Sequence, residues 1–128
     1  MNNAQAVDHN AIIRKLPIEF KSRIGVSTSD GTRILNVDHI LYCEAQSNYT
    51  KLYLLDGTSI LSSKTLGNFE KHLSDLLFKR CHKSFLVNTD EIVHFGEDIE
   101  MSSGARLPIS RRKKNEVKEW FSNRLAII

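Results

Sequence analysis

Apolar and polar residues alternate in short runs along most of the chain from Arg23 onward. Alternation with a period of two is typical of strands that bury one face, and turn pairs such as Asp30-Gly31, Asp56-Gly57 and Ser103-Gly104 separate the runs. The pattern predicts strands over residues 23–29, 32–37, 40–45, 49–55, 58–63, 78–82, 91–95, 98–103 and 105–110, with a further apolar segment over 84–88. Residues 23–36 are therefore expected to form a hairpin.

Two segments have the three- and four-residue spacing of an amphipathic helix. Over about 64–77, Ser63 is the expected N-cap and the apolar residues of one face are Leu66, Phe69, Leu73, Leu76 and Leu77. The tail from Arg111 to about Leu125 predicts a second helix, whose inner side would be formed by Val117, Trp120 and Phe121. The chain is thus predicted to be mainly β, with roughly eight or more short strands and one or two helices. The order of elements does not indicate a parallel nucleotide-binding sheet.

Composition places these elements in one domain. The chain has 128 residues, of which 41% are hydrophobic and 26% charged, which suffices for a core of its own. Residues 1–22 are polar at first, with an apolar patch around Ile12 that could make a short helix, and we interpret them as a linker or N-terminal extension of a domain at 23–128. No signal peptide or membrane span is indicated, and Cys43 and Cys81 stand alone as expected for reduced thiols, so we expect a cytoplasmic protein.

Motifs that would indicate an enzyme, a metal or a cofactor are missing from the sequence. It contains no phosphate-binding glycine motif, no zinc-protease motif and no serine-hydrolase motif, and its histidines have no ligand spacing. The neighbours Cys81 and His82 suggest a thiol nucleophile with its base. Adjacent strand residues point to opposite faces, however, which favours a buried structural cysteine beside an exposed histidine. We therefore predict a protein that is not an enzyme, with no metal and no cofactor.

The distribution of charge is more informative than the net charge of +3. Residues 24–78 carry four basic and six acidic side chains, whereas residues 79–128 carry ten basic and seven acidic ones. Three polar segments could present side chains to a nucleic acid, namely 46–51, 79–84 and 110–114. Composition alone also allows a polar hairpin loop without a partner at the first segment and an edge that discourages aggregation at the second.

The third segment gives the strongest physical indication of function. Arg111, Arg112, Lys113 and Lys114 would begin the last helix, where four positive charges oppose the helix dipole at about 0.3–1 kcal/mol each at low salt. A helix selected for stability alone would begin with acidic residues. Arginine can donate two parallel hydrogen bonds to guanine, and lysine serves as a point charge on phosphate. This local conflict indicates that function selected these residues.

The order of several motifs resembles the LytTR DNA-binding family, the output domain of bacterial LytR/AlgR-class transcriptional regulators. The resemblance extends from about Ile24 to Phe121. Its landmarks are the segments 37–45 (VDHILYCEA), 48–50 (NYT) with Asp56-Gly57, the helix through Leu66 and Phe69, 80–88 (RCHKSFLVN) and 107–112 (LPISRR). No single motif is decisive, but the combination in this order and spacing is specific.

The resemblance implies an elongated stack of small antiparallel β-sheets that reads successive major grooves of bent double-stranded DNA with loops. Base-reading positions would be Thr50, Lys83 and Arg111. Neighbouring or phosphate contacts would come from Asn48, Tyr49, Lys51, His82, Ser84, Arg112 and Lys114. It also implies repeated half-sites on the DNA, self-association there, and a receiver domain or sensor kinase of a two-component system outside this chain. Two alternatives stay open from the residues: an RNA-binding domain, and a protein-interaction domain with incidental basic patches.

Overall fold

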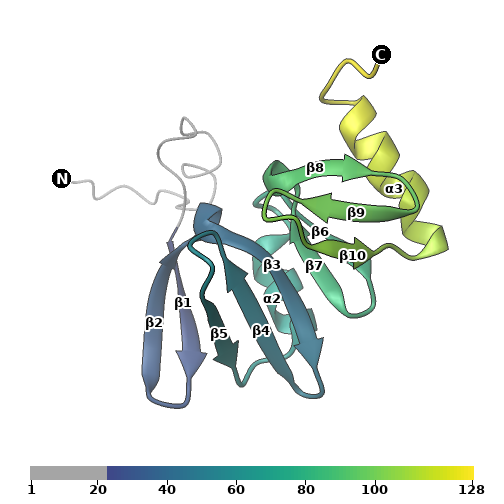
Figure 1. Cartoon of the computed structure of the whole chain (residues 1–128). Coiled ribbons are helices and arrows are strands. Elements are labelled where there is room, and N and C mark those ends of the chain that lie inside the picture. Colours follow the sequence, from purple (N-terminus) through teal and green to yellow (C-terminus); the bar gives the residue numbers. More distant parts are fainter. Residues whose placement is uncertain (1–22) are drawn as a thin grey trace, which may run out of the picture.

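The computed structural model describes residues 23–128. The predicted linker at 1–22 and its apolar patch lie outside the described residues. Within 23–128 the chain forms ten strands and two α-helices, with 3-10 turns at Val37–His39 and Thr89–Glu91 (Figure 1). The prediction of a mainly β protein with small antiparallel sheets and one or two helices is therefore confirmed.

The first five strands and two later ones, β6 and β7, form two of the three sheets. Strands β1 (Arg23–Thr28) and β2 (Gly31–Asn36) form the predicted hairpin, and the turn places Gly31 at a φ of 133°, which L side chains rarely adopt. A five-stranded antiparallel sheet follows, in the order β5-β4-β3-β7-β6. Its strands are β3 (Ile40–Gln46), β4 (Tyr49–Leu54), β5 (Ser59–Ser62), β6 (Phe78–His82) and β7 (Phe85–Asn88).

The third sheet is formed by the C-terminal strands, in the order β10-β9-β8. These strands are β8 (Ile92–Phe95), β9 (Asp98–Met101) and β10 (Arg106–Pro108). The chain then enters helix α3 (Arg111–Ser122), which ends three residues before the predicted Leu125. Val117 and Phe121 of α3 are buried and Trp120 is half-buried, so the predicted inner side of this helix is confirmed.

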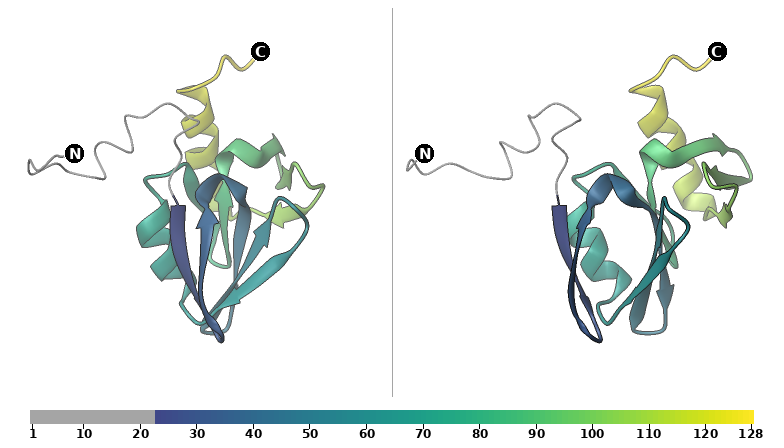
Figure 2. Two further views of the ribbon diagram at one scale, coloured as in Figure 1. Left: turned by 90° about the vertical axis from the view of Figure 1, so that its left-hand side faces the viewer. Right: turned by 60° about the vertical axis from the view of Figure 1, so that its left-hand side comes forward.

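The five-stranded sheet separates two hydrophobic clusters. On one side, Leu52 and Leu86 pack with β1 and helix α2 (Leu66–Leu73); on the other, Val87 packs with the third sheet and α3 (Figure 2). A register shift between Ile40 and Tyr42 allows four consecutive apolar residues of β3 to be shared between the two sides. Strands buried on both faces lose strict alternation, which is why these segments have continuous apolar runs.

Helix α2 is shorter than predicted, and the prediction was wrong at both ends. Its N-cap is Thr65 and not Ser63, since the Thr65 hydroxyl accepts a hydrogen bond from the amide of Asn68 at 3.2 Å. At the other end, Leu77 adopts a φ of 73° and is exposed, while its carbonyl accepts hydrogen bonds from the amide and hydroxyl of Thr89. This left-handed residue ends the helical region and directs the chain into β6.

Candidate nucleic-acid interface

The three polar segments singled out in the sequence meet along one edge of the molecule. The amide of Ala45 donates to the carbonyl of Ser84 at 2.9 Å, which sets the end of β3 beside the β6–β7 turn. The amide of Ser110 donates to the carbonyl of Cys81 at 2.9 Å, which sets the start of α3 beside the end of β6. We name the β3–β4 turn with its flanking residues (46–49) the first tip, and the β6–β7 turn (82–85) the second tip; both hairpin turns point the same way in Figure 1.

The first tip is a two-residue turn with exposed side chains. Gln46 pairs with Tyr49 across the turn, Ser47 has a φ of 59°, and residues 46–49 are all exposed, with Tyr49 at 50%. Lys51 is half-buried, with its Nζ 5.1 Å from the centre of the Tyr53 ring. Of the predicted contact residues here, Asn48 and Tyr49 are the ones the fold leaves most accessible.

Thr50 has a different environment from the one its predicted base-reading role requires. Its side chain is fully buried, and its hydroxyl donates to the carbonyl of Lys64 at 2.7 Å. Ser62, directly opposite on β5, is also buried, and its hydroxyl accepts a hydrogen bond from the amide of Lys64 at 3.2 Å. Thr50 and Ser62 thus fix the connection into α2. This conformation offers no Thr50 surface to a base, and the prediction overlooked that alternation turns Thr50 inward when Tyr49 points outward.

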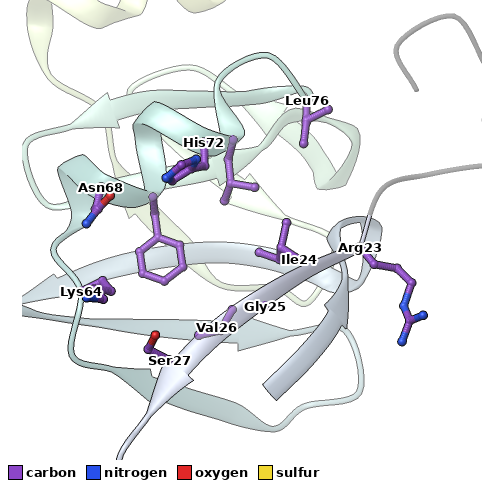
Figure 3. Close-up of a pocket in the computed structure, with 11 residues that line it drawn as sticks. Arg23, Ile24, Gly25, Val26, Ser27, Lys64, Asn68, His72 and Leu76 are labelled. Carbon is purple, nitrogen blue, oxygen red and sulfur yellow. The ribbon is translucent and has the colours of Figure 1, made fainter. Parts of the chain in front are cut away.

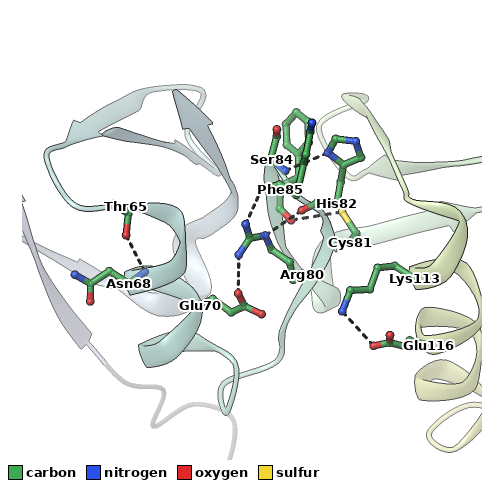
Figure 4. A network of polar contacts seen from close by, with 11 residues as sticks. Thr65, Asn68, Glu70, Arg80, Cys81, His82, Ser84, Phe85, Lys113 and Glu116 are labelled. Atoms are coloured by element: carbon green, nitrogen blue, oxygen red, sulfur yellow. Dashed lines mark hydrogen bonds and ion pairs between the residues drawn. The ribbon is translucent and has the colours of Figure 1, made fainter. Parts of the chain in front are cut away.

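The second tip presents Lys83 on a backbone held by hydrogen bonds. The Lys83 side chain is exposed and has no hydrogen bond or ion pair within residues 23–128. Its carbonyl accepts from Arg80 at 2.6 Å, the carbonyl of His82 accepts from Arg80 at 3.0 Å, and Nδ1 of His82 accepts from the amide of Ser84 at 3.1 Å (Figure 4). Side chains His82 and Ser84 are half-buried. Lys83 is therefore the accessible charge of this tip.

The start of helix α3 is strongly positive, as the sequence predicted. Ser110 is its N-cap but forms no side-chain capping bond, and the first turn contains no acidic residue. Arg111 and Arg112 are exposed and have no ion pair among the described residues, whereas Lys114 pairs with Glu97 of the β8–β9 turn at 2.9 Å. The two arginines are therefore free to bind an anion. To bind an anion, Lys114 would have to leave its ion pair with the exposed Glu97.

Cys81 is a structural residue of this region. It is fully buried, its Sγ lies 3.8 Å from the carbonyl oxygen of Phe85 and 3.6 Å from that of Pro108, and burial raises the pKa of its thiol to about 12. Burial also raises the pKa of Cys43. A nucleophilic cysteine needs a lowered pKa and access, and Cys81 has neither. Within residues 23–128 no group of three side chains could hold a metal ion, and no helix is long and apolar enough to cross a bilayer.

A separate cleft of about 450 Å³, which no sequence pattern predicted, opens between β1 and α2 (Figure 3). Its apolar lining includes Val26, Phe69 and Leu73, whose side chains belong to the hydrophobic cluster beneath. Lys64 and His72 lie among its polar lining residues, and none of the described lining residues carries a carboxylate. The two walls come from segments about forty residues apart, so no local pattern could have predicted this cleft.

Comparison with known proteins agrees with this arrangement. A family model, the LytTr DNA-binding domain, matches residues 30–122. The chain is 27% identical over 103 residues to the sensory transduction protein LytT of Bacillus subtilis (strain 168), a match that covers 76% of this chain and 42% of that protein. A solved LytTr DNA-binding domain from Bacillus cereus is similar with a TM-score of 0.61 at 26% identity, covering 84% of this chain and 99% of that domain.

Proposed function

Because the chain belongs to the family of LytTr DNA-binding domains, whose function is DNA binding in transcriptional regulation, we propose that it recognises a specific duplex sequence through the edge formed by the two tips and the start of α3. The observation that supports this most is the convergence of the three polar segments. Lys83, Arg111 and Arg112 are exposed on that edge without ion pairs to the rest of the described chain. Unpaired cations on an exposed edge are suited to a polyanion.

Within this proposal the residues have two kinds of role. Lys83 and Arg111 read base edges in successive major grooves, while His82, Ser84, Arg112 and Lys114 lie close enough in the chain to contact neighbouring groups or phosphates. At the first tip, Asn48 and Tyr49, with Lys51 behind them, take the base-reading role that the resemblance implies for Thr50. Phosphate contacts supply most of the affinity and its dependence on salt.

Partners beyond DNA belong to the same proposal. The chain spans 42% of the length of LytT, a sensory transduction protein, so a receiver domain or sensor kinase would act through other parts of such a regulator. We propose that the domain binds repeated half-sites and self-associates there. Sedimentation with and without a duplex carrying two half-sites tests this. Self-association predicts that the second copy binds the duplex more tightly than the first, whereas independent binding predicts equal affinities for the two half-sites.

Selection from random duplex DNA at controlled salt tests the function itself, with Arg111→Ala and Arg124→Ala compared in parallel. Arg111→Ala removes a positive charge from the start of α3, and Arg124→Ala removes one just after its C-terminal end. Arg124 is the control because its guanidinium stacks on Trp120, 4.0 Å from the ring centre. We expect the wild type and Arg124→Ala to enrich the same motif. Arg111→Ala should lose preference at a defined base, a change of about 1–3 kcal/mol.

A different outcome would contradict the proposed function. If no motif is enriched and weak binding only decreases as salt is raised, the proposal of sequence-specific recognition by this domain is wrong. An RNA ligand would then need testing, although exposed aromatic rings for stacking unpaired bases are few on this edge, where Tyr49 is the main one.

A further inference from the structure

Arg80 has an environment that its basic character did not suggest. It lies on β6, next to the second tip, and only 23% of its side chain is exposed. Its guanidinium donates in three directions: Nε to the carbonyl of His82 at 3.0 Å, Nη2 to the carbonyl of Lys83 at 2.6 Å, and Nη1 to Oε1 of Glu70 at 2.6 Å (Figure 4). All three nitrogens are therefore engaged within the protein.

This arrangement connects the tip to a helix. The carbonyls of a hairpin turn at an exposed edge ordinarily bond to water, but here two consecutive carbonyls bond to one planar group. Glu70 comes from helix α2 and holds the third nitrogen of the same plane. Because a guanidinium is rigid and planar, fixing one nitrogen from α2 restricts the positions of the two carbonyls that the others bind.

We propose that Arg80, oriented by Glu70, is a positioning residue that gives Lys83 its base specificity. Lysine is a point charge on a flexible stem, so it reaches a phosphate from many backbone conformations. Discrimination between bases requires that the stem begin from one fixed place and direction. Arg80 fixes that place by holding the peptide carbonyls on both sides of the Lys83 Cα, those of His82 and Lys83. The inference rests on the proposed function, since it assigns the determinant of specificity for the same edge.

The first experiment compares Arg80→Lys, Arg80→Gln and Glu70→Gln, with Arg106→Lys as the matched control. Arg106 also pairs with carboxylates, Asp98 and Glu100, but it contacts neither tip. Affinity is measured at several salt concentrations for the preferred duplex and for duplexes altered at the base that Lys83→Ala identifies.

We expect the three variants to lose about tenfold in discrimination at the base read by Lys83. Discrimination at the base read by Arg111 and the salt dependence of affinity should remain as in the wild type. In a Lys83→Ala background the same variants should have no further effect on specificity. Arg106→Lys should behave as the wild type in all of these measurements.

Two direct roles give different results and would overturn the proposal. If Arg80 binds a phosphate, Arg80→Lys retains the wild-type affinity. Arg80→Gln then weakens the affinity for all sequences alike and lowers the salt slope by about 0.9. If Glu70 acts only by repelling DNA, Glu70→Gln tightens binding to every sequence. Positioning predicts instead that the Lys and Gln variants of Arg80 lose the same discrimination at the base read by Lys83, and that Glu70→Gln loses it too without tighter binding to other sequences.

A measurement without DNA separates this inference from the proposed function. Backbone ¹⁵N relaxation of the free protein should show the amides of Lys83 and Ser84 ordered in the wild type and in Arg106→Lys, and mobile in the Arg80 and Glu70 variants, with order parameters below about 0.6. Thermal unfolding confirms that each variant is folded. If the wild type selects no motif, the proposed function fails, and these order parameters alone decide the positioning role. A tip that stays equally ordered in the variants overturns it.

Discussion

The two tips lie at the same edge and have the same length, but the rest of the chain supports them differently. At the second tip, Arg80 binds the carbonyls of His82 and Lys83, and His82 accepts from the amide of Ser84. At the first tip, the nearest comparable bond is the one from Thr50 to the carbonyl of Lys64, which secures the strand behind the turn. The side chains of the first tip are exposed, and within residues 23–128 no side chain forms such a hydrogen bond to the backbone of its turn.

This difference in backbone support suggests that the two tips contribute differently to base discrimination. A side chain whose backbone is already held loses mainly its own rotamer freedom on binding. On an unsupported turn the backbone must be ordered as well, at about 1–2 kcal/mol per residue, which offsets much of a single contact. We therefore expect the second tip to discriminate strongly between bases and the first tip to adapt to the groove.

The largest expected effect is on DNA affinity. Lys83→Ala should weaken binding to the preferred duplex by about 1–3 kcal/mol, whereas Asn48→Ala should weaken it by less than about 1 kcal/mol. Titration of a labelled duplex at fixed salt measures both. Equal losses would show that hydrogen bonds to the tip backbone do not determine how much a tip contributes.

An intermediate effect is expected on stability. Thr50→Val keeps the shape of the buried side chain but leaves the carbonyl of Lys64 without its hydroxyl donor, so the free energy of unfolding should fall by about 1–2 kcal/mol. Urea denaturation measures this change. The selected DNA motif should be the same as for the wild type; an altered base in the motif would restore the base-reading role that the sequence predicted for Thr50.

The smallest expected effect concerns the turns themselves. Ser47 has a φ of 59°, which glycine adopts without strain, so Ser47→Gly should leave the free energy of unfolding unchanged or raise it by up to about 1 kcal/mol. Lys83 and Ser84 do not have positive φ values, and Lys83→Gly should lower that free energy by about 0.5–1 kcal/mol. Thermal unfolding of the two variants, compared with wild type, shows whether the turns differ in this way.

Much of the fold could be predicted because its signals are local. The hairpin of β1 and β2, the turns at Gly31, Gly57 and Gly104, and helix α3 with its buried Val117 all follow from periodicity and turn chemistry within short windows. The ends of α2 were wrong because apolar spacing continues through Leu77, while the bonds from Thr89 that end the helical region come from twelve residues away.

For the candidate site, local sequence patterns were enough to identify the segments rich in cations and amides, since a run such as Arg111 to Lys114 opposes helix stability and has to be explained by function. That these segments share one edge follows only from the folded chain, through hydrogen bonds such as the one from the amide of Ser110 to the carbonyl of Cys81. The fold also turned Thr50 into the interior and Arg80 toward the carbonyls of the second tip. The physical reason is range: charge and periodicity are properties of a short segment, whereas burial and hydrogen-bond partners depend on residues that only the folded sheet brings together.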